Sequence, residues 1–242
     1  MKIVELLKAK QEDLRANPPV TIAFLGDSVT QGCFECYLDQ NDGIETVFDY
    51  SNAYSTRVRE ILNRMYPKVQ VNVINSGISG DSAVRGVLRV ERDVLAYRPD
   101  LAVISYGLND SMGGLEKLDN YTEALAKIFA SLQEAGVETV FLTQNFMCSV
   151  DSPLLSNGYP KLKRIAQKAQ IIQNDGVLKA YFEAAKRICA EYGVRVCDLY
   201  TIWEKMSAAG VNTTDLLSNY INHPIREYHI YAAIKLVETF LD

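Results

Sequence analysis

The feature that most constrains the fold is a series of short apolar runs separated by segments of helical periodicity. The runs are rich in Val, Ile, Leu or aromatic residues and are closed by Gly, Asn, Asp or Ser. They span residues 20–25, 69–74, 101–106, 139–143 and 194–198. Short apolar runs of this kind are typical of parallel strands that are buried on both faces. The pattern therefore predicts the strands of a mainly parallel, five-stranded sheet.

Between these runs, apolar side chains recur at the spacing of a helix face. The stripes are Ala83, Val87, Val90, Val94 and Tyr97; Leu118, Tyr121, Leu125, Ile128 and Leu132; and Leu178, Tyr181, Phe182, Ala185 and Ile188. Strands that alternate with amphipathic helices form a parallel sheet with helices on both faces. The expected fold class is α/β.

A length of 242 residues, 48% of them hydrophobic, fits one large domain with a sizeable core. We expect an N-terminal helical extension over residues 1–19, ended by Asn17-Pro18-Pro19, and the main domain over residues 20–242. We find no internal repeat and no low-complexity tract. The least regular stretches, 33–51 and 145–160, are expected to be loops that line a site.

Charge and composition exclude several classes of function. A net charge of −5 argues against a nucleic-acid binder, which usually carries a basic face. The basic cluster Lys161, Lys163, Arg164 and Lys168 is interpreted as the solvated face of a helix. No apolar run reaches the length of a membrane span, and the first residues lack the apolar core of an export signal.

The same sequence indicates no cofactor. It contains neither a phosphate-binding Gly-rich Lys-Ser/Thr loop nor a Gly-x-Gly-x-x-Gly fingerprint, so we expect no nucleotide. Five cysteines, an odd number, are expected to be reduced thiols, which predicts a cytoplasmic protein.

Polar motifs follow three of the predicted strands, and a histidine motif lies near the end of the chain. They are Gly26-Asp27-Ser28, Asn75-Ser76-Gly77, Gly107-Leu108-Asn109-Asp110 and Asn222-His223-Pro224. Ligands of open parallel sheets bind outside the carboxyl ends of the strands, so we expect these motifs to meet there.

Together the motifs fit acyl transfer. A serine hydroxyl becomes a good nucleophile when a histidine takes its proton, and the attack creates an oxyanion that needs preorganised donors. Gly77 permits close approach of a backbone N–H, and Asn109 carries two amide protons. A histidine base of ordinary pKa predicts a rate that rises between about pH 6 and pH 7.

The four motifs, in this order and spacing over roughly residues 20–240, resemble the SGNH (GDSL-type) hydrolase family, although Val29 stands where a Leu often follows the serine. The resemblance implies a single-domain, flavodoxin-like three-layer sandwich. It implies Ser28 as nucleophile, His223 as general base, and an oxyanion hole made by the backbone N–H groups of Ser28 and Gly77 with the Asn109 side chain. It also implies a carboxylic ester hydrolase that needs no cofactor or metal, with a small-molecule ester such as an acetylated carbohydrate as substrate.

The sequence departs from that family three residues before the histidine, where an Asp usually orients the imidazole and Tyr220 stands here. Asn219, Asp215 or a backbone carbonyl near Tyr220 are the alternatives for this role. Loss of the carboxylate is costly in Ser-His-Asp enzymes. A catalytically weak or degenerate binding module therefore remains an alternative function.

Two further motifs have competing interpretations. The second Gly-Asp-Ser, Gly80-Asp81-Ser82, is expected to cap the following helix, and His229 is expected to be a cap or helix-face residue. The pair Cys33 and Cys36 admits a thiol redox protein as a second alternative, although Cys148, Cys189 and Cys197 lack the close spacing of a zinc site. Oligomeric state stays open.

Overall fold

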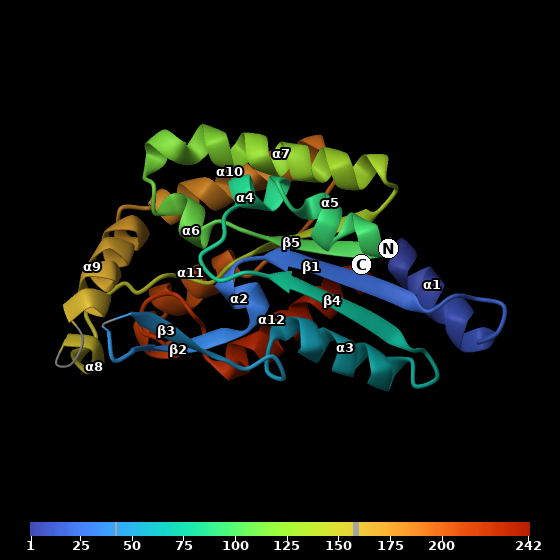
Figure 1. Cartoon of the computed structure of the whole chain (residues 1–242), viewed down its shortest axis with the longest axis horizontal. Helices are drawn as coiled ribbons and strands as arrows, with labels where there is room; N and C mark the ends of the chain where they lie inside the picture. Colours follow the sequence, from blue (N-terminus) through green and yellow to red (C-terminus); the bar gives the residue numbers. More distant parts are fainter. Residues whose placement is uncertain (42, 157–159) are drawn as a thin grey trace.

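The protein is described by a computed structural model that covers residues 1–41, 43–156 and 160–242 (Figure 1). A five-stranded sheet with strand order β4-β1-β5-β6-β7 forms its centre. All of its strand pairs are parallel. The strands are β1 (Val20–Gly26), β4 (Val71–Gly77), β5 (Leu101–Ser105), β6 (Glu138–Thr143) and β7 (Arg195–Asp198). The predicted parallel sheet is confirmed, with strand ends that differ by a few residues.

Helices cover both faces of this sheet, as the periodicity predicts. Figure 1 shows α4 (Ala83–Val87), α5 (Val90–Asp93), α7 (Leu118–Glu134) and α10 (Val177–Glu191) on one face. On the other face lie α3 (Tyr54–Met65) and α12 (Arg226–Leu241). The fold is the three-layer α/β sandwich that was expected.

The other elements are shorter or lie at the edges of the sandwich. The helices are α1 (Lys2–Glu12), α2 (Ser28–Gln31), α6 (Leu108–Ser111), α8 (Pro153–Ser156), α9 (Pro160–Asn174) and α11 (Tyr200–Ala208), and the 3₁₀ turns are η1 (Leu95–Tyr97), η2 (Leu115–Lys117) and η3 (Thr213–Leu216). In α1, Ile3, Val4 and Leu7 are buried in the same apolar core as the sheet. Over the described ranges, each helix is too short or too polar to serve as a transmembrane span.

The apolar stripe over residues 83–97 predicts one helix, but in the structure this stretch forms three short helical segments. Helix α4 is followed by α5 and by η1. The break coincides with Arg89, whose buried guanidinium donates to the carbonyl oxygens of Ser76 and Gly26 and forms an ion pair with Asp81. A buried charge must be paired and hydrogen-bonded. We infer that the helix is interrupted here because Arg89 must reach these buried partners.

The stretch 33–51 was expected to be an irregular loop, and this expectation is wrong. It forms an antiparallel hairpin of β2 (Cys33–Leu38) and β3 (Ile44–Phe48). The hairpin (blue) lies beside the C-terminal segment (red), at the carboxyl ends of the sheet strands (Figure 1). Within the other expected loop, 145–160, the chain forms α8, and residues 157–159 lie outside the described residues.

Candidate active site

Ser28 lies where β1 passes into α2. Asp27 is the N-cap of this helix: one carboxylate oxygen accepts the Val29 N–H at 3.0 Å, and the other accepts Gln144 Nε2 at 2.9 Å. Burial raises the pKa of Asp27 to about 6, against the effect of the Gln144 hydrogen bond. The cap fixes Ser28 as the first residue of α2, with 4% of its surface exposed.

His223 lies directly against Ser28. Its Nε2 is 2.9 Å from Ser28 Oγ, and its Nδ1 is 2.8 Å from the carbonyl oxygen of Phe34. A carbonyl oxygen only accepts hydrogen bonds, so Nδ1 carries the proton and Nε2 is free to accept the serine proton. Burial lowers the pKa of His223 to about 4, and the Phe34 hydrogen bond opposes this shift. The imidazole is therefore neutral and in the tautomer that a general base requires.

The Phe34 carbonyl takes the orienting role for which the sequence suggested Asn219, Asp215 or a carbonyl near Tyr220. Asn219 Oδ1 accepts hydrogen bonds from the backbone N–H groups of Ile221, Asn222 and His223 at 2.9–3.0 Å. It therefore stabilises the loop, whereas the imidazole Nδ1 of His223 is bound by Phe34. Asp215 is engaged with the Asn212 side chain. The three alternatives are wrong because the partner comes from a hairpin that the sequence did not reveal.

A β-bulge explains why the Phe34 carbonyl points at the histidine. Cys33 pairs with Phe48 and Cys36 with Thr46, so the register shifts between Cys33 and Cys36. A bulge leaves backbone groups outside the ladder and redirects them, and bulges are frequent beside active sites. Phe34 lies inside the shifted stretch, and its carbonyl is free to accept from His223 Nδ1.

The predicted oxyanion-hole residues lie at the carboxyl ends of adjacent strands, but not all of their N–H groups are free to bind an oxyanion. Asn109 lies in α6, and its Nδ2 donates to the carbonyl of Asp81 at 2.8 Å, which leaves the second amide proton free of that contact. The Gly77 N–H instead donates to Asn75 Oδ1 at 3.0 Å. A Cβ on Gly77 would lie 2.2 Å from the Gln31 backbone nitrogen. Gly77 therefore permits close packing of β4 on α2, and its predicted role as a free donor does not fit this arrangement.

Gly80, in the turn after β4, presents a donor that sequence reasoning missed. Its backbone lies in the left-handed region with φ +76°. Among the described residues, its N–H has no hydrogen-bond partner. Ser79 N–H donates to Gln31 Oε1 at 2.7 Å, and the Asp81 carbonyl accepts from Asn109. Gly80 is thus held between the helix that Ser28 begins and the Asn109 side chain.

The second Gly-Asp-Ser motif does not cap α4 through its own side chains. Ser82 stands at the N-cap position without a side-chain cap bond, and Asp110 Oδ1 accepts the Ala83 N–H at 2.9 Å. Asp81 forms a buried ion pair with Arg89 at 2.6 Å. Of the two expected cap residues, Asp81 or Ser82, Ser82 occupies the N-cap position, whereas the Asp81 carboxylate neutralises the buried arginine.

His229 is a buried residue on the face of α12, in agreement with the expectation of a cap or helix-face residue. Its Nδ1 accepts the N–H of Tyr54, the first residue of α3, at 3.1 Å. Burial lowers its pKa to about 3. It lines a small cavity of about 20 Å³ with Ser105 and Gln144. His229 therefore accepts a hydrogen bond from the first residue of α3, and its ring packs on that of Phe34 with centroids 4.7 Å apart.

The five cysteines are free thiols. Cys33 is buried, and burial raises its pKa to about 12, which makes it a poor nucleophile at neutral pH. Cys36 lies 3.6 Å from Asn219 Nδ2. Within the described ranges, no group of three or more His, Cys, Asp and Glu residues is arranged to hold a metal ion.

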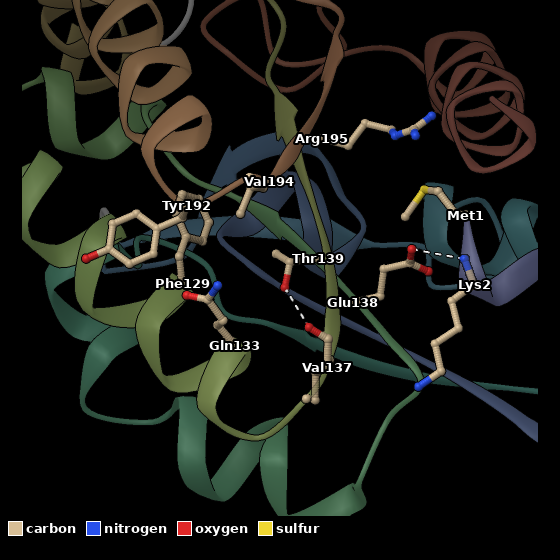
Figure 2. Close-up of a pocket in the computed structure, with 12 residues that line it drawn as sticks. Met1, Lys2, Phe129, Gln133, Val137, Glu138, Thr139, Tyr192, Val194 and Arg195 are labelled. Atoms are coloured by element: carbon tan, nitrogen blue, oxygen red, sulfur yellow. Dashed lines mark hydrogen bonds between the residues drawn. The ribbon is translucent and has the colours of Figure 1, made fainter.

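A cavity of about 390 Å³ opens at the opposite end of the sheet, beside the starts of β6 and β7 (Figure 2). Lys2, Glu138 and Arg195 lie around it. The Glu138 carboxylate accepts the backbone N–H groups of Lys2 and Ile3, both at 3.0 Å, and so caps α1. None of the predicted site residues lines this cavity.

Comparisons with known proteins find relatives among esterases. The chain is 33% identical over 89 residues to an acetylxylan esterase of Geobacillus stearothermophilus, a match that covers 37% of this chain and 39% of the relative. It is 25% identical over 157 residues to the GDSL esterase/lipase CPRD49 of Arabidopsis thaliana, covering 60% of this chain and 58% of the relative. The matches therefore span less than two thirds of either relative.

Solved structures share the fold. An acetyl xylan esterase, AlAXEase, superposes with a TM-score of 0.64 at 19% identity, over 90% of this chain and 98% of that one. The model of the GDSL-like lipase/acylhydrolase family matches residues 24–229, which include Ser28, Asn109 and His223. The chain belongs to the GDSL-like lipase/acylhydrolase family.

Proposed function

We propose that this protein is a serine esterase that hydrolyses a carboxylic ester through an acyl-Ser28 intermediate. The observation that carries the proposal is the 2.9 Å contact between Ser28 Oγ and His223 Nε2, with His223 Nδ1 held by the Phe34 carbonyl. A nucleophile, a base and a group that orients the base are the parts that acyl transfer needs.

In the proposed reaction, His223 Nε2 takes the hydroxyl proton as Ser28 Oγ attacks the ester carbonyl. The bond to the alcohol then breaks, and His223 returns the proton to the leaving oxygen. Water, activated by the same base, releases the acid. The oxyanion formed in each step is stabilised by the Ser28 N–H and the Asn109 amide. The Gly80 N–H, which has no hydrogen-bond partner within the described part of the chain, is the third donor in place of Gly77.

The Phe34 carbonyl differs from a carboxylate in one respect that matters for catalysis. It fixes the tautomer of His223, but it carries no full negative charge to stabilise the imidazolium that forms. The burial that lowers the pKa of His223 to about 4 acts in the same direction. We therefore propose a base that is correctly oriented but weaker than the histidine of a complete triad.

The substrate class that we propose is a short acyl ester, such as an acetyl group on a carbohydrate. Acetylxylan esterases among the similar proteins support this choice. The test is a panel of esters of increasing acyl length, together with acetylated sugars, assayed with the wild type and Ser28→Ala. Turnover that is highest for acetyl esters and lost in the variant supports the proposal. Turnover that persists in the variant contradicts it.

The free state of all five thiols fits the cytoplasmic location that we propose.

A catalytically weak binding module is the second candidate, and the observation that favours it is that His223 Nδ1 bonds to a carbonyl and not to a carboxylate. Binding of an acetylated sugar by wild type and Ser28→Ala alike, without turnover by either, would support the binding module.

A further inference from the structure

Arg226 joins the histidine segment to both strands of the hairpin. It is the first residue of α12, three positions after His223. Its guanidinium binds the Glu35 carboxylate through two bonds of 2.6 and 3.1 Å, and its Nε donates to Asp49 Oδ2 at 2.9 Å. It also lies 4.2 Å from the centre of the Phe34 ring. We call Arg226, Glu35, Asp49 and the Phe34 ring the Arg226 clamp.

The clamp lies where the register of the hairpin ladder shifts. Glu35 follows Phe34 inside the shifted stretch of β2, and Asp49 follows the last residue of β3. Because the ladder is interrupted there, its hydrogen bonds do not fix the direction of the Phe34 carbonyl. The Arg226 side chain contacts the ring of Phe34 and the carboxylate of its neighbour, and so it holds this carbonyl in line with His223 Nδ1.

The ion pairs of the clamp contribute more to the placement of its side chains than to the free energy of unfolding. Its side chains are partly exposed, at 34% for Arg226, 44% for Glu35 and 21% for Asp49. Exposed ion pairs add little to the free energy of unfolding, whereas a bidentate guanidinium–carboxylate pair adds geometric specificity. The hydrogen bond from Arg226 lowers the pKa of Glu35, so the pair stays charged at neutral pH.

We propose that Arg226 is a positioning residue for catalysis: it holds the Phe34 carbonyl that orients His223 and so replaces the rigidity that a triad carboxylate provides. The inference rests on the proposed function, since it assigns a second contact behind the proposed base. Misplacement of a catalytic group by about 1 Å can lower turnover by about a hundredfold. A residue that acts only on the base should change kcat and leave KM nearly unaltered.

The kinetic test compares Arg226→Gln and Arg226→Lys with Glu204→Gln, which removes a separate ion pair to Lys179. We expect Arg226→Gln to lower kcat by about ten- to a hundredfold with KM within about twofold. Arg226→Lys keeps the positive charge but cannot form the two parallel bonds to Glu35, so its kcat should lie between those of the wild type and Arg226→Gln. Glu204→Gln should match the wild type. An unchanged kcat in Arg226→Gln would overturn the proposal.

Nuclear magnetic resonance of ¹⁵N-histidine gives a readout that needs no turnover. The chain has two histidines. In His223 the proton is on Nδ1, whereas in His229 Nδ1 accepts from Tyr54, so the two rings have opposite tautomers. In Arg226→Gln we expect faster exchange of the His223 Nδ1 proton and a mixed tautomer. His229 packs on the Phe34 ring, but its Nδ1 still accepts the Tyr54 N–H, so its tautomer, the internal reference, should not change. A His223 signal identical to that of the wild type would contradict the proposal.

Two additions keep the outcome decisive. If Arg226→Gln does not fold, the double variant Glu35→Gln/Asp49→Asn neutralises both partners and should give the same changes in kcat and in the His223 signal. Failure of the proposed function is separable: a wild type without any esterase turnover removes the function, whereas the tautomer measurement still reports whether Arg226 holds the Phe34 carbonyl.

Discussion

The candidate site is built from two halves that are held in different ways. The sheet half carries Ser28 and Asn109 on turns after β1 and β5, fixed by buried contacts such as those of Asp27 with Gln144. The hairpin half carries the buried residues His223 and Phe34, and the partly exposed ion pairs of Arg226 join their segments. The nucleophile thus belongs to the rigid core, whereas the orientation of the base depends on how well two surface segments are joined.

This difference predicts that substitution of Ser28 or Asn109 in the sheet half lowers turnover more than substitution of the residues that hold the base in the hairpin half. It also predicts that pH acts on the two halves separately. Buried carboxyl groups with raised pKa lie in the sheet half, and the buried histidine with lowered pKa lies in the hairpin half. The predictions below test these contrasts.

The largest effect is expected at Ser28. Replacement by Ala removes the attacking oxygen, so kcat for an acetyl ester should fall by about 10⁴-fold or more. The chain provides a matched control in its second Gly-Asp-Ser motif, where Ser82 makes no side-chain cap bond. Ser82→Ala should retain wild-type turnover. Loss of turnover in Ser82→Ala with retention in Ser28→Ala would reverse the assignment.

Asn109 tests the oxyanion donors of the sheet half. Asn109→Ala should lower kcat by about a hundred- to a thousandfold with little change in KM, because the amide acts mainly on the charge of the transition state. Asn72→Ala, which removes a side-chain contact with Thr21 in the same sheet, is the control. A loss of only a few-fold in Asn109→Ala excludes the donor role.

The pH profile tests the hairpin half. A general base must be neutral, so the rate should rise with pH through the pKa of His223, which burial lowers to about 4. The rise between pH 6 and pH 7 expected from an ordinary histidine is therefore replaced by a flat profile above about pH 5.5. An ordinary pKa of about 6.5 would instead give about tenfold less activity at pH 5.5 than at pH 7.5. Preincubation at the lowest pH, followed by assay at pH 7.5, controls for unfolding.

The smallest effect is expected in the stability of the sheet half. Burial raises the pKa of Asp110 to about 7, and its Oδ2 is buried without a hydrogen-bond partner among the described residues. Since the folded pKa is above the unfolded value of about 3.9, the stabilising contribution of the neutral carboxyl is fully present below about pH 4 and is lost as pH rises to about 7.

Asp110→Asn should therefore remove part of the decline in Tm between about pH 4.5 and pH 7, by a few degrees. The amide oxygen still accepts the Ala83 N–H, so the helix cap is kept. Calorimetry of both proteins across this range is the measurement. Parallel Tm curves for the two proteins would show that Asp110 does not titrate with a raised pKa.

The two halves also differ in what the sequence reveals. The sheet half was predicted because apolar runs and the turns that follow them are local in the chain, and neighbouring parallel strands bring their carboxyl ends together. Ser28 and Asn109 were located in this way. Gly77 was assigned wrongly because sequence alone does not show that the Asn75 side chain occupies its N–H.

In the hairpin half, the sequence motif predicted His223 but neither its Phe34 partner nor the Arg226 contacts, because these contacts join residues far apart in the chain. Phe34 and His223 are separated by 189 positions, and Glu35 and Arg226 by 191. A backbone carbonyl has no signature of residue type, so no motif marks Phe34 as the partner of the imidazole. The residues 33–38 also show no clear alternation of apolar and polar side chains, which is why the strand was interpreted as a loop.

The measurement that tests the central claim most directly is covalent labelling with a fluorophosphonate probe, located by peptide mass spectrometry. The account predicts one adduct, on Ser28, that is absent in Ser28→Ala and forms more slowly in Arg226→Gln. Absence of an adduct on the folded wild type, or an adduct on another serine that persists in Ser28→Ala, would contradict the claim that His223, held by the Phe34 carbonyl, activates Ser28.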